Sequence, residues 1–135
     1  MNISFAKKMP NGDPTGFREK VLNKIKTSTI RNDPTDRIQV GKKLHLCENI
    51  RTKNYNCFAQ AIVTKVERVN IYKVAKLITP ASFQMTDLLD ESYLLTLQIA
   101  TQSIIRAEGF STSDEFFSWF SIPQKNLKLI EFELL

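Results

Sequence analysis

The sequence has little of the material from which metal sites and histidine-based catalytic sites are built. Its 135 residues include one histidine, His45, and two cysteines, Cys47 and Cys57. A His-based zinc site or a Ser-His-Asp triad needs more histidine, and the two cysteines form no CxxC pair. We therefore expect no metal and no cofactor. We also expect both cysteines to be reduced, half-buried strand residues rather than a disulfide.

Long apolar runs are also missing. No stretch approaches the roughly 20 apolar residues that span a bilayer. The N-terminal MNISFAKKMP places its lysines after a short apolar run, which is the reverse of the order in a secretory signal. These features predict a cytoplasmic protein with no membrane-inserted segment. The length predicts a single domain over residues 1–135, and the sequence leaves the oligomeric state open.

The two charge signs are unevenly distributed along the chain. Residues 1–76 carry 16 lysines and arginines against 6 acids, a balance of +10, whereas residues 77–135 carry 3 against 8, a balance of −5. This split fits charge pairing across a fold, and it also fits a protein that meets phosphate groups. Four lysines have two possible roles: they form either a solvated surface or a rim that attracts phosphate. They are Lys7, Lys8, Lys42 and Lys43.

Hydrophobic periodicity predicts an α+β fold. Four strands are expected, at 3–6, 43–50, 57–69 and 127–134, the second and third paired as a hairpin. A helix starting near residue 15 would have an apolar face formed by Phe17, Val21, Leu22 and Ile25. Because sequential strands of this kind can curl up, the order predicts a small mixed or antiparallel β-barrel with flanking helices.

The segment from about 77 to 105 is predicted to be a helical insertion. Its expected apolar face comprises Leu88, Leu89, Leu95 and Ile99. Gly109 can end this helix, and Thr112 with Glu115 has capping-box spacing for a further helix that Pro123 would stop. The aromatic side of that helix is expected to be core rather than a base-stacking platform; its residues are Phe116, Phe117, Trp119 and Phe120.

The stretch KTSTIR, residues 26–31, packs two cations and three hydroxyls into six residues. Such groups suit the end of a helix, where they satisfy free carbonyls and complement the helix dipole. They also suit amide cleavage, which needs a nucleophile, a base and an oxyanion stabiliser. Lys26 and Thr29 are three positions apart, so they would lie on opposite faces of a continuous strand. A shared site therefore requires a bend.

Three pieces of sequence, in order, resemble the ASCH domain family, whose fold is the PUA-like β-barrel. They are KTSTIR, a strand introduced by VGKKLHL, and AEGF followed by a helix ending in SWF. The match covers most of the chain. The family's glycine shortly before the motif lysine is Lys24 here, and the segment from about 76 to 103 is longer than in compact members.

The resemblance implies a function and a site. Small bacterial members of the family hydrolyse N4-acetylcytidine to cytidine and acetate with a lysine, a threonine and a glutamate. By motif position these are Lys26 as base, Thr29 as nucleophile, and Glu108, which would orient the lysine or hold the attacking water. Other relatives are RNA-associated, so a non-catalytic RNA-binding module and a ribonuclease of the same fold are the alternatives. The expected partners are a small-molecule nucleoside or RNA.

Arg31 and Ser28 are the candidate substrate-binding residues. The fork of donors of Arg31 suits a phosphate or a base carbonyl, and its alternative role is an ion pair with Asp33 or Asp36. Ser28 alternatively satisfies backbone groups at the bend. Lys26 can act as a base only if its pKa falls from about 10.4 towards neutrality. Burial lowers that pKa and a nearby carboxylate raises it, and the sequence leaves this balance open.

Overall fold

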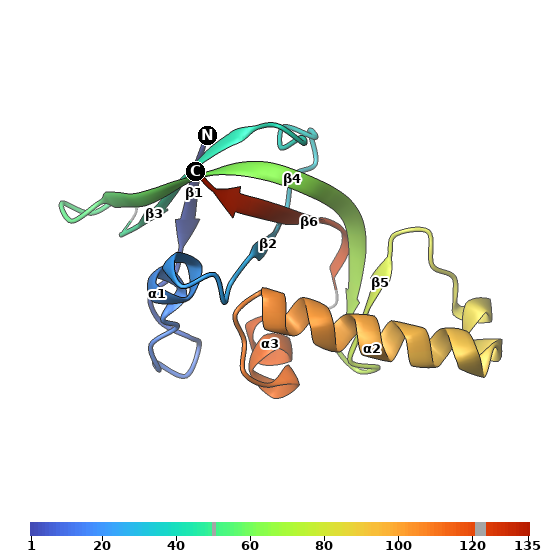
Figure 1. The fold of residues 1–135 in the computed structure, drawn as a ribbon. Helices are drawn as coiled ribbons and strands as arrows, with labels where there is room; N and C mark the ends of the chain where they lie inside the picture. Colours follow the sequence, from blue (N-terminus) through green and yellow to red (C-terminus); the bar gives the residue numbers. More distant parts are fainter. Residues whose placement is uncertain (50, 121–123) are drawn as a thin grey trace.

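A strongly curved sheet forms the body of the protein (Figure 1). The computed structural model describes residues 1–49, 51–120 and 124–135. The elements in chain order are β1 (Asn2–Phe5), α1 (Phe17–Leu22), β2 (Ser28–Arg31), β3 (Lys43–Glu48), β4 (Asn56–Tyr72), β5 (Leu77–Pro80), η1 (Met85–Leu89), α2 (Glu91–Ala107), α3 (Ser113–Trp119) and β6 (Gln124–Leu134). The predicted α+β class is confirmed.

The six strands in the described part of the chain have the order β1-β3-β4-β6-β2, with β5 paired to β4. The β1–β3 pair is parallel and the other pairs are antiparallel, including the predicted hairpin of β3 and β4. The register of β4 on β6 shifts between Val63 and Lys65 and again between Val69 and Ile71. Such irregularities bend a strand and increase its twist. The two long strands therefore arch together over α2 and α3, as Figure 1 shows.

The sheet does not close into the predicted barrel. Among the described residues β1 and β2 are the two ends of the strand order, and no backbone ladder joins them. A side chain lies between them instead, because Arg31 on β2 donates from Nη2 to the carbonyl of Ser4 on β1 at 2.8 Å. Paired strands lie about 4.8 Å apart, which leaves no room for an interposed guanidinium. The gap between these edges is where the candidate site lies.

The helical insertion differs from the prediction. It begins with β5, which pairs with the end of β4, and helix follows only from Met85 onwards. The buried face of α2 is formed by Leu97, Thr101 and Ile105, and the hydroxyl of Thr101 accepts a hydrogen bond from the β5 residue Ile78. The predicted apolar face was wrong: Leu89, Leu95 and Ile99 are exposed, and only Leu88 is half-buried. Leucine and isoleucine occur on both sides of α2, so periodicity could not show which side packs.

Several local predictions can be compared directly with the structure. Gly109 follows α2 with φ 89°, and Thr112 caps α3 by accepting from the Glu115 amide at 3.2 Å. In α1 the residues Phe17 and Val21 are buried as expected, but Leu22, at the last position of the helix, and Ile25, beyond its end, are exposed. The predicted strand end at Ile50 and the predicted helix stop at Pro123 lie outside the described residues.

The prediction of reduced cysteines was wrong. Cys47 and Cys57 face each other across β3 and β4 and form a disulfide. The sequence prediction considered only cysteines that are close in sequence, as in a CxxC motif. Cys47 and Cys57 are brought side by side by the register of the β3–β4 hairpin, and the spacing of the cysteines alone does not reveal that register. Disulfides are rare in the cytosol, so the cytoplasmic location stays a prediction. Within the described ranges, no helix has both the length and the apolar character needed to cross a membrane.

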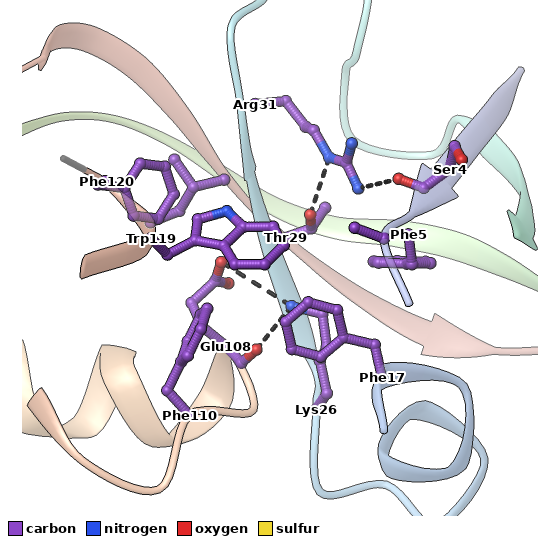
Figure 2. A pocket seen from close by; sticks show the side chains of 12 residues that line it. Ser4, Phe5, Phe17, Lys26, Thr29, Arg31, Glu108, Phe110, Trp119 and Phe120 are labelled. Carbon is purple, nitrogen blue, oxygen red and sulfur yellow. Dashed lines mark hydrogen bonds and ion pairs between the residues drawn. The ribbon is translucent and has the colours of Figure 1, made fainter. Parts of the chain in front are cut away.

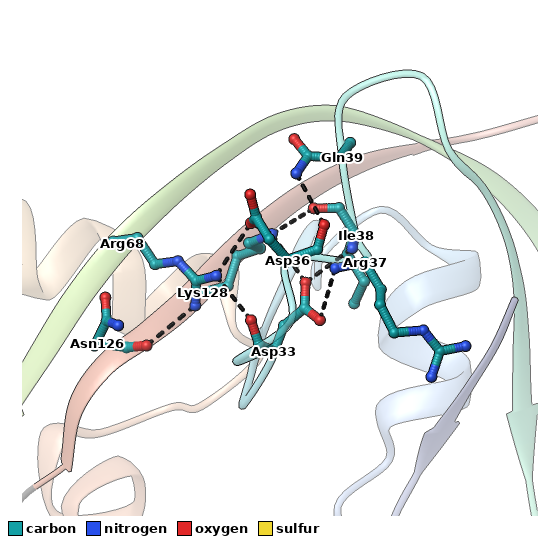
Figure 3. A network of polar contacts seen from close by, with 8 residues as sticks. All are labelled: Asp33, Asp36, Arg37, Ile38, Gln39, Arg68, Asn126 and Lys128. Atoms are coloured by element: carbon teal, nitrogen blue, oxygen red, sulfur yellow. Dashed lines mark hydrogen bonds and ion pairs between the residues drawn. The ribbon is translucent and has the colours of Figure 1, made fainter.

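A buried ion-pair network anchors the loop that follows β2 (Figure 3). Lys128 of β6 is 2% exposed and donates to the carboxylates of Asp33 and Asp36 and to the carbonyl of Ile38. Burial alone would raise the pKa of Asp33, but hydrogen bonds from the Ile38 and Arg37 amides and from Lys128 hold it at about 2. Breaking a buried pair such as Lys128–Asp33 costs about 3–5 kcal/mol, so this pair fixes the chain just beyond β2, whereas Asp36 is exposed.

Candidate active site

The motifs KTSTIR and AEGF lie side by side in the structure. The amide of Thr27 donates to the carbonyl of Ala107 at 2.9 Å, and the carbonyl of Thr27 accepts from Phe132 on β6 at 3.1 Å. The chain bends before Lys26, where Lys24 has φ 60°, and not between Lys26 and Thr29 as predicted. This left-handed conformation favours glycine, which explains physically why a glycine suits this position. The bend turns the side chain of Lys26 towards the end of α2.

Lys26 is a buried amine, with 3% of its surface exposed. Its Nζ donates to the carbonyl of Ser28 at 2.8 Å and to the carbonyl of Glu108 at 2.7 Å, and it lies 3.9 Å from Glu108 Oε1. Burial lowers the pKa of Lys26 from 10.5 to about 8; the charge of Glu108 raises it, and those of Arg31 and Lys20 lower it. Desolvation therefore outweighs the ion pair, and the neighbouring cations that lower the pKa of Lys26 are Arg31 and Lys20.

The hydrogen bonds of Lys26 suit its neutral form. A neutral amine has two N–H donors and one lone pair, whereas the ammonium has three donors and no acceptor. The two backbone carbonyls use two donors, and the carboxylate at 3.9 Å is beyond hydrogen-bond range. Deprotonation therefore leaves a lone pair without breaking either carbonyl hydrogen bond. The rings of Phe17 and Phe5 lie 4.7 and 5.5 Å from Nζ. Their faces attract a cation and so favour the ammonium, which means that burial is the effect that lowers the pKa of Lys26.

Glu108 is the C-cap residue of α2 and is 3% exposed. Its Oε2 accepts a hydrogen bond from the hydroxyl of Ser28, and its other carboxylate oxygen, Oε1, lies 3.9 Å from Lys26 Nζ. Ser28 was predicted to bind substrate, but it does not line the cavity around Lys26 and Thr29. Its contact makes it a positioning residue for the carboxylate.

Thr29 and Arg31 form the opposite side of the site. The Nε of Arg31 donates to the hydroxyl oxygen of Thr29 at 2.9 Å, and the guanidinium lies 5.3 Å from the ring of Phe5. Burial lowers the pKa of Arg31, while the charge of Glu108 raises it. The alternative ion pair with Asp33 or Asp36 is not formed, because both of these acids bind Lys128. Arg31 instead holds Thr29 and β1 in place through its hydrogen bonds to the hydroxyl of Thr29 and to the carbonyl of Ser4.

Lys26, Thr29, Arg31 and Glu108 all line one cavity of about 150 Å³ (Figure 2). Aromatic side chains complete its wall; they are Phe5, Phe17, Phe110, Trp119 and Phe120. The prediction that the aromatic side of α3 is core holds for Phe116 and Phe117, which are buried. Trp119 and Phe120 are half-buried and face the cavity. A cavity of this size accepts a single six-membered ring.

Gly109 is a site residue that sequence reasoning read only as a helix stop. A Cβ added at Gly109 would lie 3.2 Å from Cβ and 3.3 Å from Cδ of Lys26. Its carbonyl also accepts from Lys20 Nζ at 2.6 Å. The glycine of AEGF thus lets the stem of Lys26 lie against the end of α2. This contact forms only because two segments distant in sequence lie together in the fold, so the sequence alone does not predict the role of Gly109.

Comparisons with protein-family models, curated proteins and solved structures gave no significant match. The roles of these residues therefore rest on their geometry and chemistry.

Proposed function

We propose that the protein is an amidohydrolase of the ASCH type that removes the acetyl group from N4-acetylcytidine or a similar acylated nucleoside. The single observation that carries this proposal is the assembly of Lys26, Thr29 and Glu108 around one small cavity, although Glu108 is distant in sequence. In this proposal the open β1–β2 edge is the mouth of a PUA-like scaffold. A planar base enters with its acetylated end first, and the ribose stays at the mouth.

The first half of the reaction forms an acyl-enzyme. Thr29 Oγ attacks the acetyl carbonyl carbon, and its proton passes to the lone pair of Lys26. The guanidinium of Arg31, which already contacts Thr29 Oγ at 2.9 Å, lies where the developing oxyanion needs donors. The C–N4 bond then breaks. Protonated Lys26 returns its proton to N4, so cytidine leaves as the neutral amine and the acetyl group stays on Thr29.

The second half restores the enzyme. A water held by Glu108 attacks the acetyl ester, and Lys26 again accepts the proton. Protonated Lys26 returns this proton to Thr29 Oγ as the ester C–O bond breaks, so Thr29 leaves as the hydroxyl. The product is acetic acid, which loses its proton to solvent and departs as acetate. Glu108 also keeps Lys26 in place, because its carbonyl binds Nζ at 2.7 Å while its carboxylate is held by Ser28. Both steps need the neutral amine, which the lowered pKa of Lys26, about 8, makes accessible near neutral pH.

RNA binding is the second candidate. Lys7, Lys8, Lys42 and Lys43 are all exposed, in keeping with a rim that attracts phosphate. Phosphate-dominated binding weakens steeply with salt, so the affinity for short RNAs should fall along a negative log–log slope. A flat slope, or no binding at low salt, removes this candidate. Shortened RNA in the same samples would instead indicate a ribonuclease.

The proposed activity is tested by incubating the protein with N4-acetylcytidine and separating the products by chromatography. We expect cytidine and acetate in equal amounts. Parallel reactions with nucleosides acylated at other amines test the substrate. Turnover of one of these alone would keep the reaction class and change the substrate. No turnover of any acylated nucleoside by folded protein would refute the proposal.

A further inference from the structure

The outward face of α2 carries apolar side chains that nothing in the described chain covers. Leu95 is 57% exposed and Ile99 is 64% exposed, one turn apart. A different face of α2, which includes Thr101, packs on β5. Exposed apolar groups on consecutive turns of one helix indicate an interaction surface more strongly than scattered ones do.

The exposed stripe of α2 continues with polar residues in coiled-coil spacing. Its members are Glu91, Leu95, Ile99, Gln102 and Arg106. Steps of three and four residues keep side chains on one face of a helix. All five of these residues are exposed. The stripe therefore runs along nearly the full length of α2.

The charges on this stripe are placed symmetrically about its centre. Glu91 at the start and Arg106 near the end lie about equally far from Ile99. Neither residue forms an ion pair with the described part of the chain. A stripe with an acid at one end, a base at the other and apolar groups between is complementary to a copy of itself running in the opposite direction.

We propose that α2 is the interface of a homodimer, in which α2 of a second copy packs antiparallel on this stripe around a two-fold axis near Ile99. Ile99 then meets the partner's Ile99, and Leu95 packs beside the partner's Gln102. Glu91 pairs with the partner's Arg106 at both ends, because a two-fold interface repeats every contact. Antiparallel packing also places the opposite ends of the two helix dipoles together.

The interface does not depend on the proposed chemistry, because none of the five stripe residues lines the cavity around Lys26. The proposed interface is therefore tested by measuring the oligomeric state of the protein and not its turnover. Sedimentation velocity of the full chain, from low micromolar to near-millimolar protein, is expected to show a monomer–dimer equilibrium. A monomer at every concentration would overturn the proposal.

Charge reversals give the sharper test. The 91–106 contact occurs twice in a two-fold interface, so Glu91→Arg and Arg106→Glu each create two pairs of like charges. Each variant alone should therefore raise the dimer dissociation constant roughly tenfold or more. The double variant E91R/R106E restores opposite charges at both ends and should recover the dimer. The double variant also places both charges unfavourably for the dipole of α2, so recovery cannot come from a more stable helix. A double variant no better than the single ones would contradict the antiparallel arrangement.

The apolar centre is tested by Ile99→Asp, which should abolish the dimer while leaving the thermal unfolding of the monomer unchanged. Val74→Asp is the matched control, because Val74 is 96% exposed and lies outside α2. This control should dimerise like the wild type. If Ile99→Asp dimerises normally, or Val74→Asp is equally disruptive, α2 is not the interface.

Discussion

The side-chain amine of Lys26 and the main-chain carbonyl of Glu108 are 2.7 Å apart, although 82 positions separate the two residues. One belongs to the bend before β2, and the other ends α2. The contact ties the base of the proposed reaction to the carboxylate that orients it. Every change that shifts the end of α2 should therefore also shift Lys26.

The pH dependence of turnover should follow Lys26. Burial lowers its pKa to about 8, and only the neutral amine accepts a proton. We expect kcat/KM to rise about tenfold per pH unit below that value and to level off above it. Rates measured across this range with N4-acetylcytidine check the expectation. A rate that does not change with pH on either side of 8 would contradict the role of Lys26 as base.

The same pKa predicts the sign of a stability effect. Between about 8 and 10.5 the unfolded chain holds a proton on Lys26 that the folded chain has lost. The unfolded state binds more protons there, so Lys26 makes the free energy of unfolding rise with pH across this window. Urea denaturation of the wild type and of Lys26→Met at several pH values isolates the contribution. An equal pH dependence in both proteins would show that the amine titrates normally.

Gly109 and Gly41 form a matched pair for testing the contact with Lys26. Their φ angles are 89° and 88°, but an added Cβ meets Lys26 at Gly109 and nothing within 4 Å at Gly41. Gly41→Ala should cost about 1–2 kcal/mol of stability from backbone strain alone. Gly109→Ala should cost about 1–3 kcal/mol more, because the methyl group displaces a packed side chain. Only Gly109→Ala should also lower turnover. Equal losses at both positions would mean that Lys26 moves aside freely.

Arg31 is expected to act on Thr29 rather than to hold the substrate. Arg31→Lys keeps the charge but removes the Nε donor that contacts Thr29 Oγ1. We expect kcat to fall about 10²–10³-fold with little change in KM. Arg37→Lys, at an exposed arginine, should change neither constant. A raised KM with normal kcat would instead indicate that Arg31 binds the substrate.

Much of the fold followed from local patterns, whereas the site depended on long-range geometry. The alternation from Ile130 to Leu134 and the cap at Thr112 are local and were predicted correctly. The open edge, the disulfide and the buried face of α2 depend on which strands pair, and periodicity does not encode that. The motifs at Lys26 and Glu108 identified residues that the fold brings together, but not the hydrogen bonds that hold them.

Turnover of N4-acetylcytidine by Thr29→Ala, compared with Thr27→Ala, tests the central claim most directly. The two threonines are in the same motif, but Thr29 is buried at the cavity and Thr27 is exposed outside it. If Thr29 is the nucleophile, its loss should lower kcat by orders of magnitude, because no covalent route remains. Thr27→Ala should match the wild type. Equal turnover by Thr29→Ala and the wild type would contradict the proposed mechanism.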